Sequence, residues 1–149
     1  MISQNYDEMR GVGELYTSKF NLFKQGGFLS AKTYLNFAVA VVVGEGTKTG
    51  WFVFDGKFSD WVLLEDRGFI ALVDGHRFMG EGEMRNTDTK VEGYDVMCFE
   101  EMHVEFDMDL LDLMGGAQSI KIRVGGTDFV LAPDILADIK ELKAAVAQV

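Results

Sequence analysis

The chain has 149 residues, of which 48% are hydrophobic and 26% charged, and this balance is typical of one globular domain rather than a disordered segment. We therefore predict a single domain over residues 1–149. Fourteen basic residues against 24 acidic ones give a net charge of -10, which disfavours nucleic acid and anionic membrane surfaces as partners.

The N-terminal segment is polar. Residues 1–10 include Asp7 and Glu8, which is the wrong composition for a secretory signal. The longest apolar run, residues 37–43, is too short to cross a bilayer and predicts a buried strand instead. If the chain starts at its natural start, these features predict a cytoplasmic protein. We expect residues 1–13 to form a loose arm or a helical turn.

Short apolar segments separated by turn signals dominate the chain and predict antiparallel strands. Asp-Gly and Gly-Gly pairs supply the positive φ angles of tight hairpins, so we expect turns at Gly26-Gly27, Asp55-Gly56, Asp74-Gly75 and Gly125-Gly126. In chain order, the expected strands are residues 15–24, 33–43, 50–54, 61–64, 69–73, 77–80, 83–91, 94–106, 119–124 and 128–131.

The expected strand over residues 33–43 is apolar on both faces. Phe37 and Val39 lie on one face, and Ala38 and Ala40 lie on the other. A strand that is buried on both faces belongs in the centre of a sheet. We therefore expect a second sheet layer on one side of it and the C-terminal helix on the other.

Two helices are expected after the last long strand. Asp107 is a suitable N-cap for a short helix near residues 108–114. Pro133 fits the first turn of a C-terminal helix, whose apolar stripe is Ile135, Ile139, Leu142 and Val146. The predicted fold class is α+β and predominantly antiparallel β. It is a β-sandwich or a strongly bent sheet, with the short helix near 108–114 and the C-terminal amphipathic helix packed on the sheet.

Aromatic side chains are concentrated around the Asp55-Gly56 turn signal, and the ones we single out are Trp51, Phe54, Phe58 and Trp61. Tryptophan and phenylalanine bring large contact areas to interfaces, so this cluster could line a pocket or anchor a protein partner. Alternatively, the four residues belong to the core of adjacent strands, as in most β-sandwiches. The sequence leaves both interpretations open.

A second candidate site lies on the expected strand over residues 94–106. Glu101, His103 and Glu105 alternate with apolar residues and therefore share one face. Carboxylates and an imidazole in this arrangement could bind Zn²⁺, Mn²⁺ or Fe²⁺ if His76, from a neighbouring hairpin, completed the set. The alternative is the solvated face of a half-buried strand in an acidic protein.

No sequence motif indicates catalysis. The chain has no glycine-rich nucleotide loop, no His-Glu-x-x-His and no Gly-x-Ser-x-Gly, and its single cysteine, Cys98, has the apolar neighbours of a small buried hydrophobe. We therefore predict a non-catalytic module without a cofactor that binds a protein partner or a second copy of itself. One alternative is a small-molecule or metal-binding protein, such as a hydrolase or isomerase, that uses the acidic and histidine face. Another is a structural assembly subunit.

Overall fold

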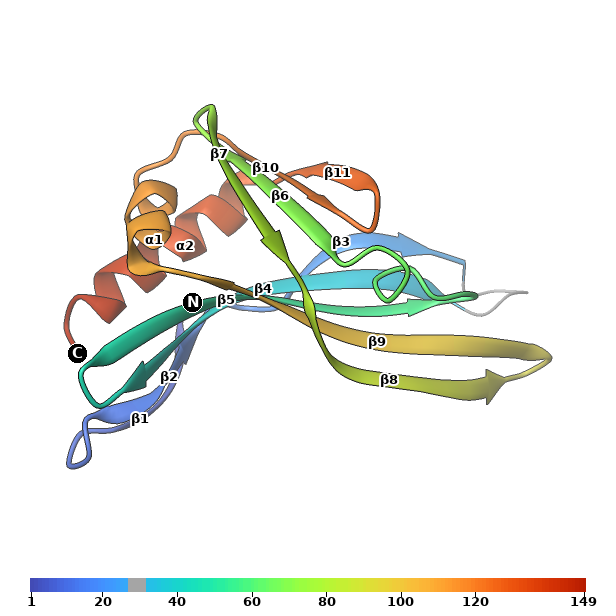
Figure 1. Ribbon diagram of the computed structural model, residues 1–149, viewed down its shortest axis with the longest axis horizontal. Coiled ribbons are helices and arrows are strands. Elements are labelled where there is room, and N and C mark those ends of the chain that lie inside the picture. Colours follow the sequence, from blue (N-terminus) through green and yellow to red (C-terminus); the bar gives the residue numbers. More distant parts are fainter. Residues whose placement is uncertain (27–31) are drawn as a thin grey trace.

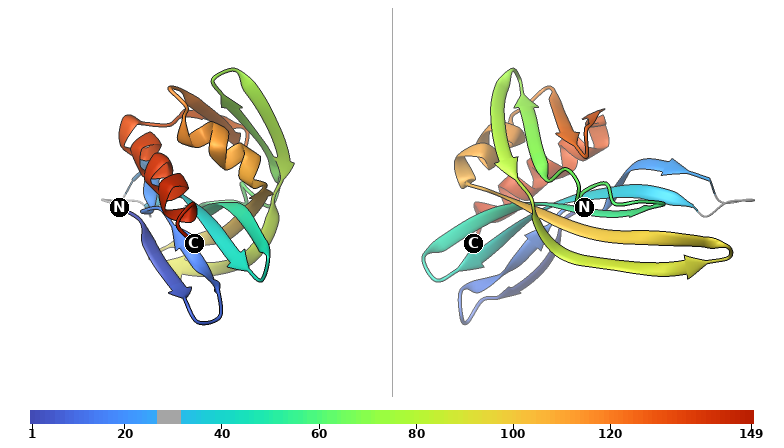
Figure 2. Two further views of the ribbon diagram at one scale, coloured as in Figure 1. Left: turned by 90° about the vertical axis from the view of Figure 1, so that its left-hand side faces the viewer. Right: turned by 45° about the vertical axis from the view of Figure 1, so that its right-hand side comes forward.

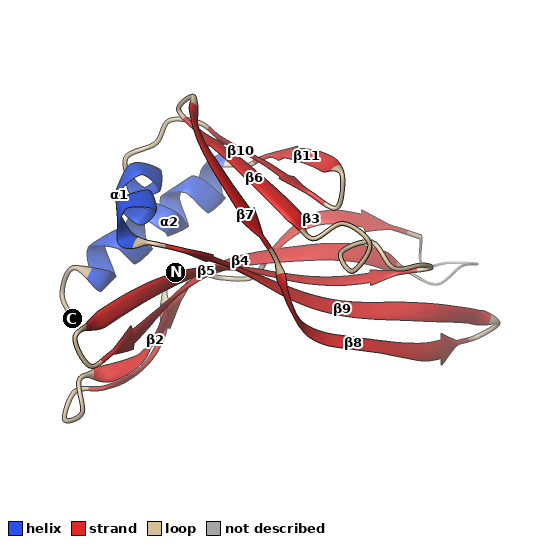
Figure 3. Ribbon diagram, viewed as in Figure 1, coloured by secondary structure: helices blue, strands red, loops and turns tan. Residues whose placement is uncertain are grey.

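The computed structural model describes residues 1–26 and 32–149 (Figure 1). Strands dominate these residues, and two helices follow the last long hairpin (Figure 3). The predicted α+β fold, predominantly antiparallel β, is confirmed. In chain order the elements are β1 (Ser3–Asp7), β2 (Val12–Tyr16), β3 (Phe20–Gln25), β4 (Thr33–Gly44), β5 (Thr47–Phe58), β6 (Gly68–Val73), β7 (His76–Glu81), β8 (Glu83–Glu92), β9 (Asp95–Phe106), α1 (Met108–Gly115), β10 (Ile120–Val124), β11 (Thr127–Val130) and α2 (Pro133–Val146).

Seven strands form the larger antiparallel sheet, in the order β1-β2-β4-β5-β9-β8, with β3 also paired to β4. β2 pairs with residues 40–43 of β4, and β3 pairs with residues 33–37 of the same strand. The expected strand over residues 15–24 is therefore two strands on one edge of β4. Thr17 bridges the break between them, because its amide donates to the Val39 carbonyl at 2.9 Å and its hydroxyl accepts from the Val39 amide at 3.0 Å.

The other four strands form a smaller antiparallel sheet in the order β11-β10-β6-β7. Asp74-Gly75 and Gly125-Gly126 have positive φ angles at both positions, as tight two-residue hairpins require. The chain leaves this sheet through Gly82 and enters the larger sheet as β8. A Cβ atom at Gly82 would lie 2.1 Å from the sulfur of Met102, so a larger residue at this crossing would displace the Met102 side chain.

The hydrophobic core lies on one face of the larger sheet. Phe37 and Val39 are fully buried there and belong to one cluster with side chains of both helices and the smaller sheet. Figure 2 shows the helices and the smaller sheet on one side of the larger sheet. The prediction that the C-terminal helix covers the opposite face of β4 is therefore wrong. On that outer face Ala40 needs no helix to bury it, because it is small and lies between its cross-strand partners Tyr16 and Trp51.

Both helices begin where the sequence predicts, and the predicted apolar stripe of α2 faces the core. Asp107 is the N-cap of α1, and its carboxylate accepts a hydrogen bond from the Leu110 amide at 3.2 Å. Pro133 opens α2. The predicted apolar stripe of α2 is buried in the core, and it consists of Ile135, Ile139, Leu142 and Val146. The two helices lie against each other and cover one end of the larger sheet (Figure 1).

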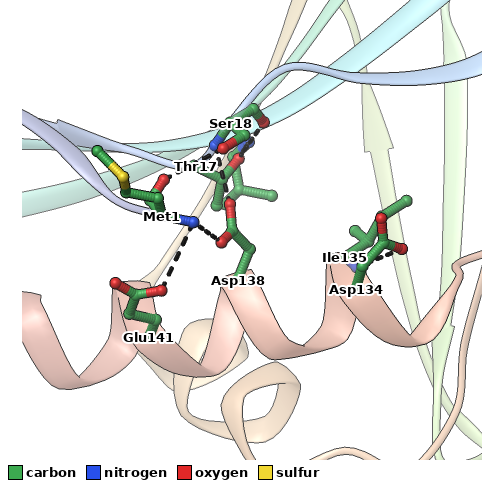
Figure 4. Close-up of polar contacts among 8 residues, drawn as sticks. Met1, Thr17, Ser18, Asp134, Ile135, Asp138 and Glu141 are labelled. Carbon is green, nitrogen blue, oxygen red and sulfur yellow. Dashed lines mark hydrogen bonds and ion pairs between the residues drawn. The ribbon is translucent and has the colours of Figure 1, made fainter.

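Asp138 connects α2 to the N-terminal segment. Its buried carboxylate accepts a hydrogen bond from the Ser18 amide at 2.9 Å and pairs with the amino group of Met1 (Figure 4). Burial alone would raise the pKa of Asp138, but the bonds to Met1 and Ser18 outweigh this effect, and the net pKa lies below its usual value. The N-terminal residues form strand β1, paired with β2, so the expectation of a loose arm or a helical turn over residues 1–13 is wrong.

Residues 61–64 form a turn rather than the expected strand. The Val62 and Leu63 amides both donate to one oxygen of the Glu100 carboxylate at 3.0 Å. The Leu64 amide donates to the other oxygen at 2.7 Å. Glu100 is only 3% exposed, and a buried carboxylate requires such donors. The contacts to Glu100 therefore override the strand propensity of this apolar run.

Asp55-Gly56 is not a turn. Both residues lie within β5, which continues to Phe58 and pairs with β4 on one side and β9 on the other. The Asp55 carboxylate forms an ion pair with Lys19 at 2.5 Å, and Gly56 keeps a φ angle that other residues also adopt. The turn expected at Gly26-Gly27 extends into residues 27–31, which lie outside the described residues.

Candidate functional site

The acidic and histidine residues of the second candidate site are divided between the two sheets. Glu101, His103 and Glu105 share the outer face of β9, as their alternation predicts. The Nε2 atom of His103 lies 3.1 Å from Glu101 Oε2, but off the direction of a hydrogen bond. His76 is the first residue of β7, in the smaller sheet. Among residues 1–26 and 32–149, no group of three or more His, Cys, Asp or Glu residues is placed to hold a metal ion.

The four aromatic residues do not share one surface. Phe54 is fully buried in the core, whereas Trp51 lies on the opposite face of the same strand, β5. Trp51 is half-buried, and the guanidinium of Arg85 lies 5.2 Å from the centroid of its ring. Phe58 and Trp61 are half-buried as well. The alternation of side chains along β5 therefore divides the aromatic stretch between the core and the outer face.

Exposed apolar and basic side chains instead gather on the outer face of the smaller sheet. Strand register arranges them in two rows across the four strands. One row consists of Arg77, Leu72, Lys121 and Val130. The other consists of Met79, Ile70, Arg123 and Asp128. We call these residues the basic face. The surface is hollowed there by about 320 Å³.

The apolar side chains of the basic face are open to solvent. Leu72, Met79 and Val130 are 36%, 67% and 73% exposed. Residues that alternate with them along the strands, such as Phe69 and Ile122, are buried in the core. The exposed side chains are therefore separate from the core, and their grouping on one sheet face is typical of a contact surface.

Basic groups outnumber acidic ones on this face. Arg123 forms two hydrogen bonds to Asp128, at 2.6 and 3.1 Å, and Lys121 lies 3.7 Å from the same carboxylate. These contacts, mainly the hydrogen bonds from Arg123, lower the pKa of Asp128. Arg77 forms no ion pair within the part of the chain that the structure describes. Three cations and one carboxylate give this face a net charge of about +2 in a chain of -10.

Sequence reasoning found only part of the basic face. Lys121 and Arg123 alternate along one strand, so the sequence itself places them on one face. Arg77 and Met79 reach the same surface because β6 pairs with both β7 and β10. The alternation of Arg77 and Met79 around the half-buried Phe78 was a signal of an exposed strand face. It did not reveal the neighbouring strand.

The outer face of the larger sheet has a hollow of opposite charge, with a volume of about 430 Å³. Small apolar side chains and charged ones line it together. We call it the acidic groove, and we define it by Glu14, Tyr16, Lys19, Ala38, Ala40, Val53, Asp55 and Glu101. The hydrogen bond to Asp55 raises the pKa of Lys19. Three carboxylates and one cation give the groove a net charge of about -2.

No protein-family model, curated protein or solved structure matches this chain. Within the described residues, neither helix combines the length and the apolar character needed to cross a membrane.

Proposed function

We propose that this protein is a non-catalytic interaction module, and that its basic face binds an acidic surface of another protein or of a second copy. One observation carries this proposal. Exposed apolar side chains are interleaved with cations on a single sheet face of a strongly acidic chain, and these side chains are Leu72, Met79, Val130, Arg77, Lys121 and Arg123.

The two kinds of side chain have complementary effects on binding. Burial of the exposed apolar surface of Met79 and Val130 in a contact removes it from water, which favours association. Methionine also adapts its shape to different partners. Arg77 has its guanidinium free of intramolecular ion pairs among the described residues, and such a group binds a partner carboxylate through two parallel hydrogen bonds. The cations thus favour an acidic partner.

The chemistry of the basic face supports binding rather than catalysis. Its side chains are aliphatic residues, methionine, arginine, lysine and a single carboxylate, that of Asp128. The lowered pKa of Asp128 makes it a weak base. Arg123 donates a hydrogen bond to each oxygen of the Asp128 carboxylate, so both oxygens are already paired within the protein. Among the described residues, those that line this face carry no hydroxyl or thiol group.

A labelled peptide in which glutamate and leucine alternate is a suitable probe, because it presents the proposed combination of acidic and apolar groups. We expect fluorescence anisotropy to show binding that weakens as salt is added. Arg77→Glu is expected to weaken it at least about tenfold. Arg10→Glu, which reverses an exposed cation in the β1–β2 turn, is the matched control. Absence of binding, or equal losses in both variants, would contradict the proposal.

A further inference from the structure

We propose that copies of this chain associate head to tail, with the basic face of one copy seated on the acidic groove of the next. This inference rests on the proposed function, since it uses the same contact surface and adds the identity of the partner. The two surfaces lie on the outer faces of different sheets, with the core and both helices between them (Figures 1 and 2). One copy therefore cannot bring its own two surfaces together.

Each surface has charges that are not compensated within the described residues. On the basic face this charge is Arg77. In the acidic groove, Glu14 is exposed and forms no ion pair within residues 1–26 and 32–149. Among the described residues, the ion pair that Glu101 forms is with His103, and it exists when the imidazole is protonated. Asp55, in contrast, is already held by Lys19. A head-to-tail contact would give Arg77 a carboxylate partner and give Glu14 a cationic partner.

The apolar parts of the two surfaces also match. The lining of the groove includes small apolar side chains, among them Ala38 and Ala40. Tyr16, 39% exposed, borders it, and Val42, 41% exposed, lies beside it on β4. The hollow of about 430 Å³ is large enough for a long unbranched side chain. Met79 of the neighbouring copy, 67% exposed and flexible, fits this description.

Charge distinguishes this arrangement from a twofold dimer. A symmetric contact between two basic faces would oppose about +2 to +2, and one between two grooves would oppose about -2 to -2. Only the pairing of unlike faces brings opposite charges together. A contact between unlike faces leaves one face unoccupied at each end of the assembly, so further copies can add. Association then produces either a closed ring or an open filament.

Sedimentation velocity of the whole chain, from about 1 µM to about 1 mM, tests this inference. We expect species larger than dimers that dissociate as salt is added. Met79→Asp, on the basic face, and Ala38→Trp, which fills the groove, should each weaken association at least about tenfold. Glu14→Lys serves as a second groove variant, because it changes only an exposed side chain. Val91→Asp and Thr89→Trp, at exposed positions of β8, are the matched controls.

Mixing the variants distinguishes the head-to-tail contact from other contacts. The Met79→Asp variant keeps an intact groove, and the Ala38→Trp variant keeps an intact basic face. Their equimolar mixture should form a 1:1 complex that grows no further. A monomeric wild-type chain over the whole range, a closed twofold dimer, or the absence of a mixed complex would overturn the inference. If the wild-type chain stays monomeric but binds the acidic peptide through its basic face, only the inference fails. If it does neither, the proposed function fails with it.

Discussion

Glu100 and Glu101 are adjacent in the chain, yet they lie on opposite sides of the larger sheet and make different contacts. Glu100 lies on the inner side of β9 and accepts hydrogen bonds from three backbone amides. Glu101 lies on the outer side, is half-buried, and its carboxylate lies 3.1 Å from Nε2 of His103. A carboxylate on the inner side has to be satisfied inside the molecule, because burial penalises every unmade bond. On the outer side a carboxylate can stay available to a partner.

The largest expected effect comes from placing a charge on the inner side. Ile139 is fully buried on α2, and we expect Ile139→Asp to lower the free energy of unfolding by about 4 kcal/mol or more. Urea denaturation measures this change. Leu113→Asp, at a position 46% exposed on α1, should cost less than about 1 kcal/mol. An unchanged stability in Ile139→Asp would contradict the burial of α2 against the sheet.

The comparison between the two glutamates can be tested directly. Glu100→Gln keeps the shape of the side chain but places an amide group among backbone donors, and we expect a loss of about 2–3 kcal/mol in the free energy of unfolding. Glu101→Gln should change it by less than about 0.5 kcal/mol, because its side chain makes no comparable bonds. Similar losses in both variants would mean that the side of the sheet does not decide the role of the carboxylate.

Asp138, which is buried inside the molecule, makes the stability of the fold depend on pH. Its folded pKa lies below the ordinary value of 3.8, so its contribution to stability is complete above about pH 4 and is lost as the pH falls through the folded pKa. Asp138→Asn should lower the free energy of unfolding by about 1–2 kcal/mol near neutral pH. It should also make this free energy depend less on pH in the acid range. Glu141→Gln changes an exposed carboxylate near the Met1 amino group, and it should leave the loss of stability in acid unchanged.

The smallest expected effect on stability comes from the basic face. Arg77 has no ion pair among the described residues, so Arg77→Glu should change the free energy of unfolding by less than about 0.5 kcal/mol. The same substitution should still weaken binding of the acidic peptide. A change in thermal stability as large as that of Asp138→Asn would show that Arg77 serves the fold itself.

The sequence predicts well where structure is determined locally. The Gly125-Gly126 hairpin, the Asp107 cap and the buried stripe of α2 each depend on residues within a few positions of one another, and all three are confirmed. Residues 61–64 were assigned wrongly, because the group that organises them is Glu100, which is remote in the chain. Composition alone could not reveal that contact.

The candidate surfaces escaped prediction for the same physical reason. Alternation shows which residues of one strand share a face, and it correctly grouped Glu101 with His103. It does not show which strands become neighbours. Arg77 joins the basic face through the order β11-β10-β6-β7, and no local pattern specifies that order. The candidate surfaces therefore became visible only with the strand register.

The crossing at Gly82 has a consequence for the kinetics of folding. After β5 the chain leaves the larger sheet, forms the β6–β7 hairpin of the smaller one, and returns through β8 and β9 before β10 pairs with β6. Neither sheet is complete until distant segments of the other have been placed. Such non-local pairing slows folding because long loops must close before their contacts form. We therefore expect slow refolding with a single cooperative transition, in which neither sheet is stable without the other.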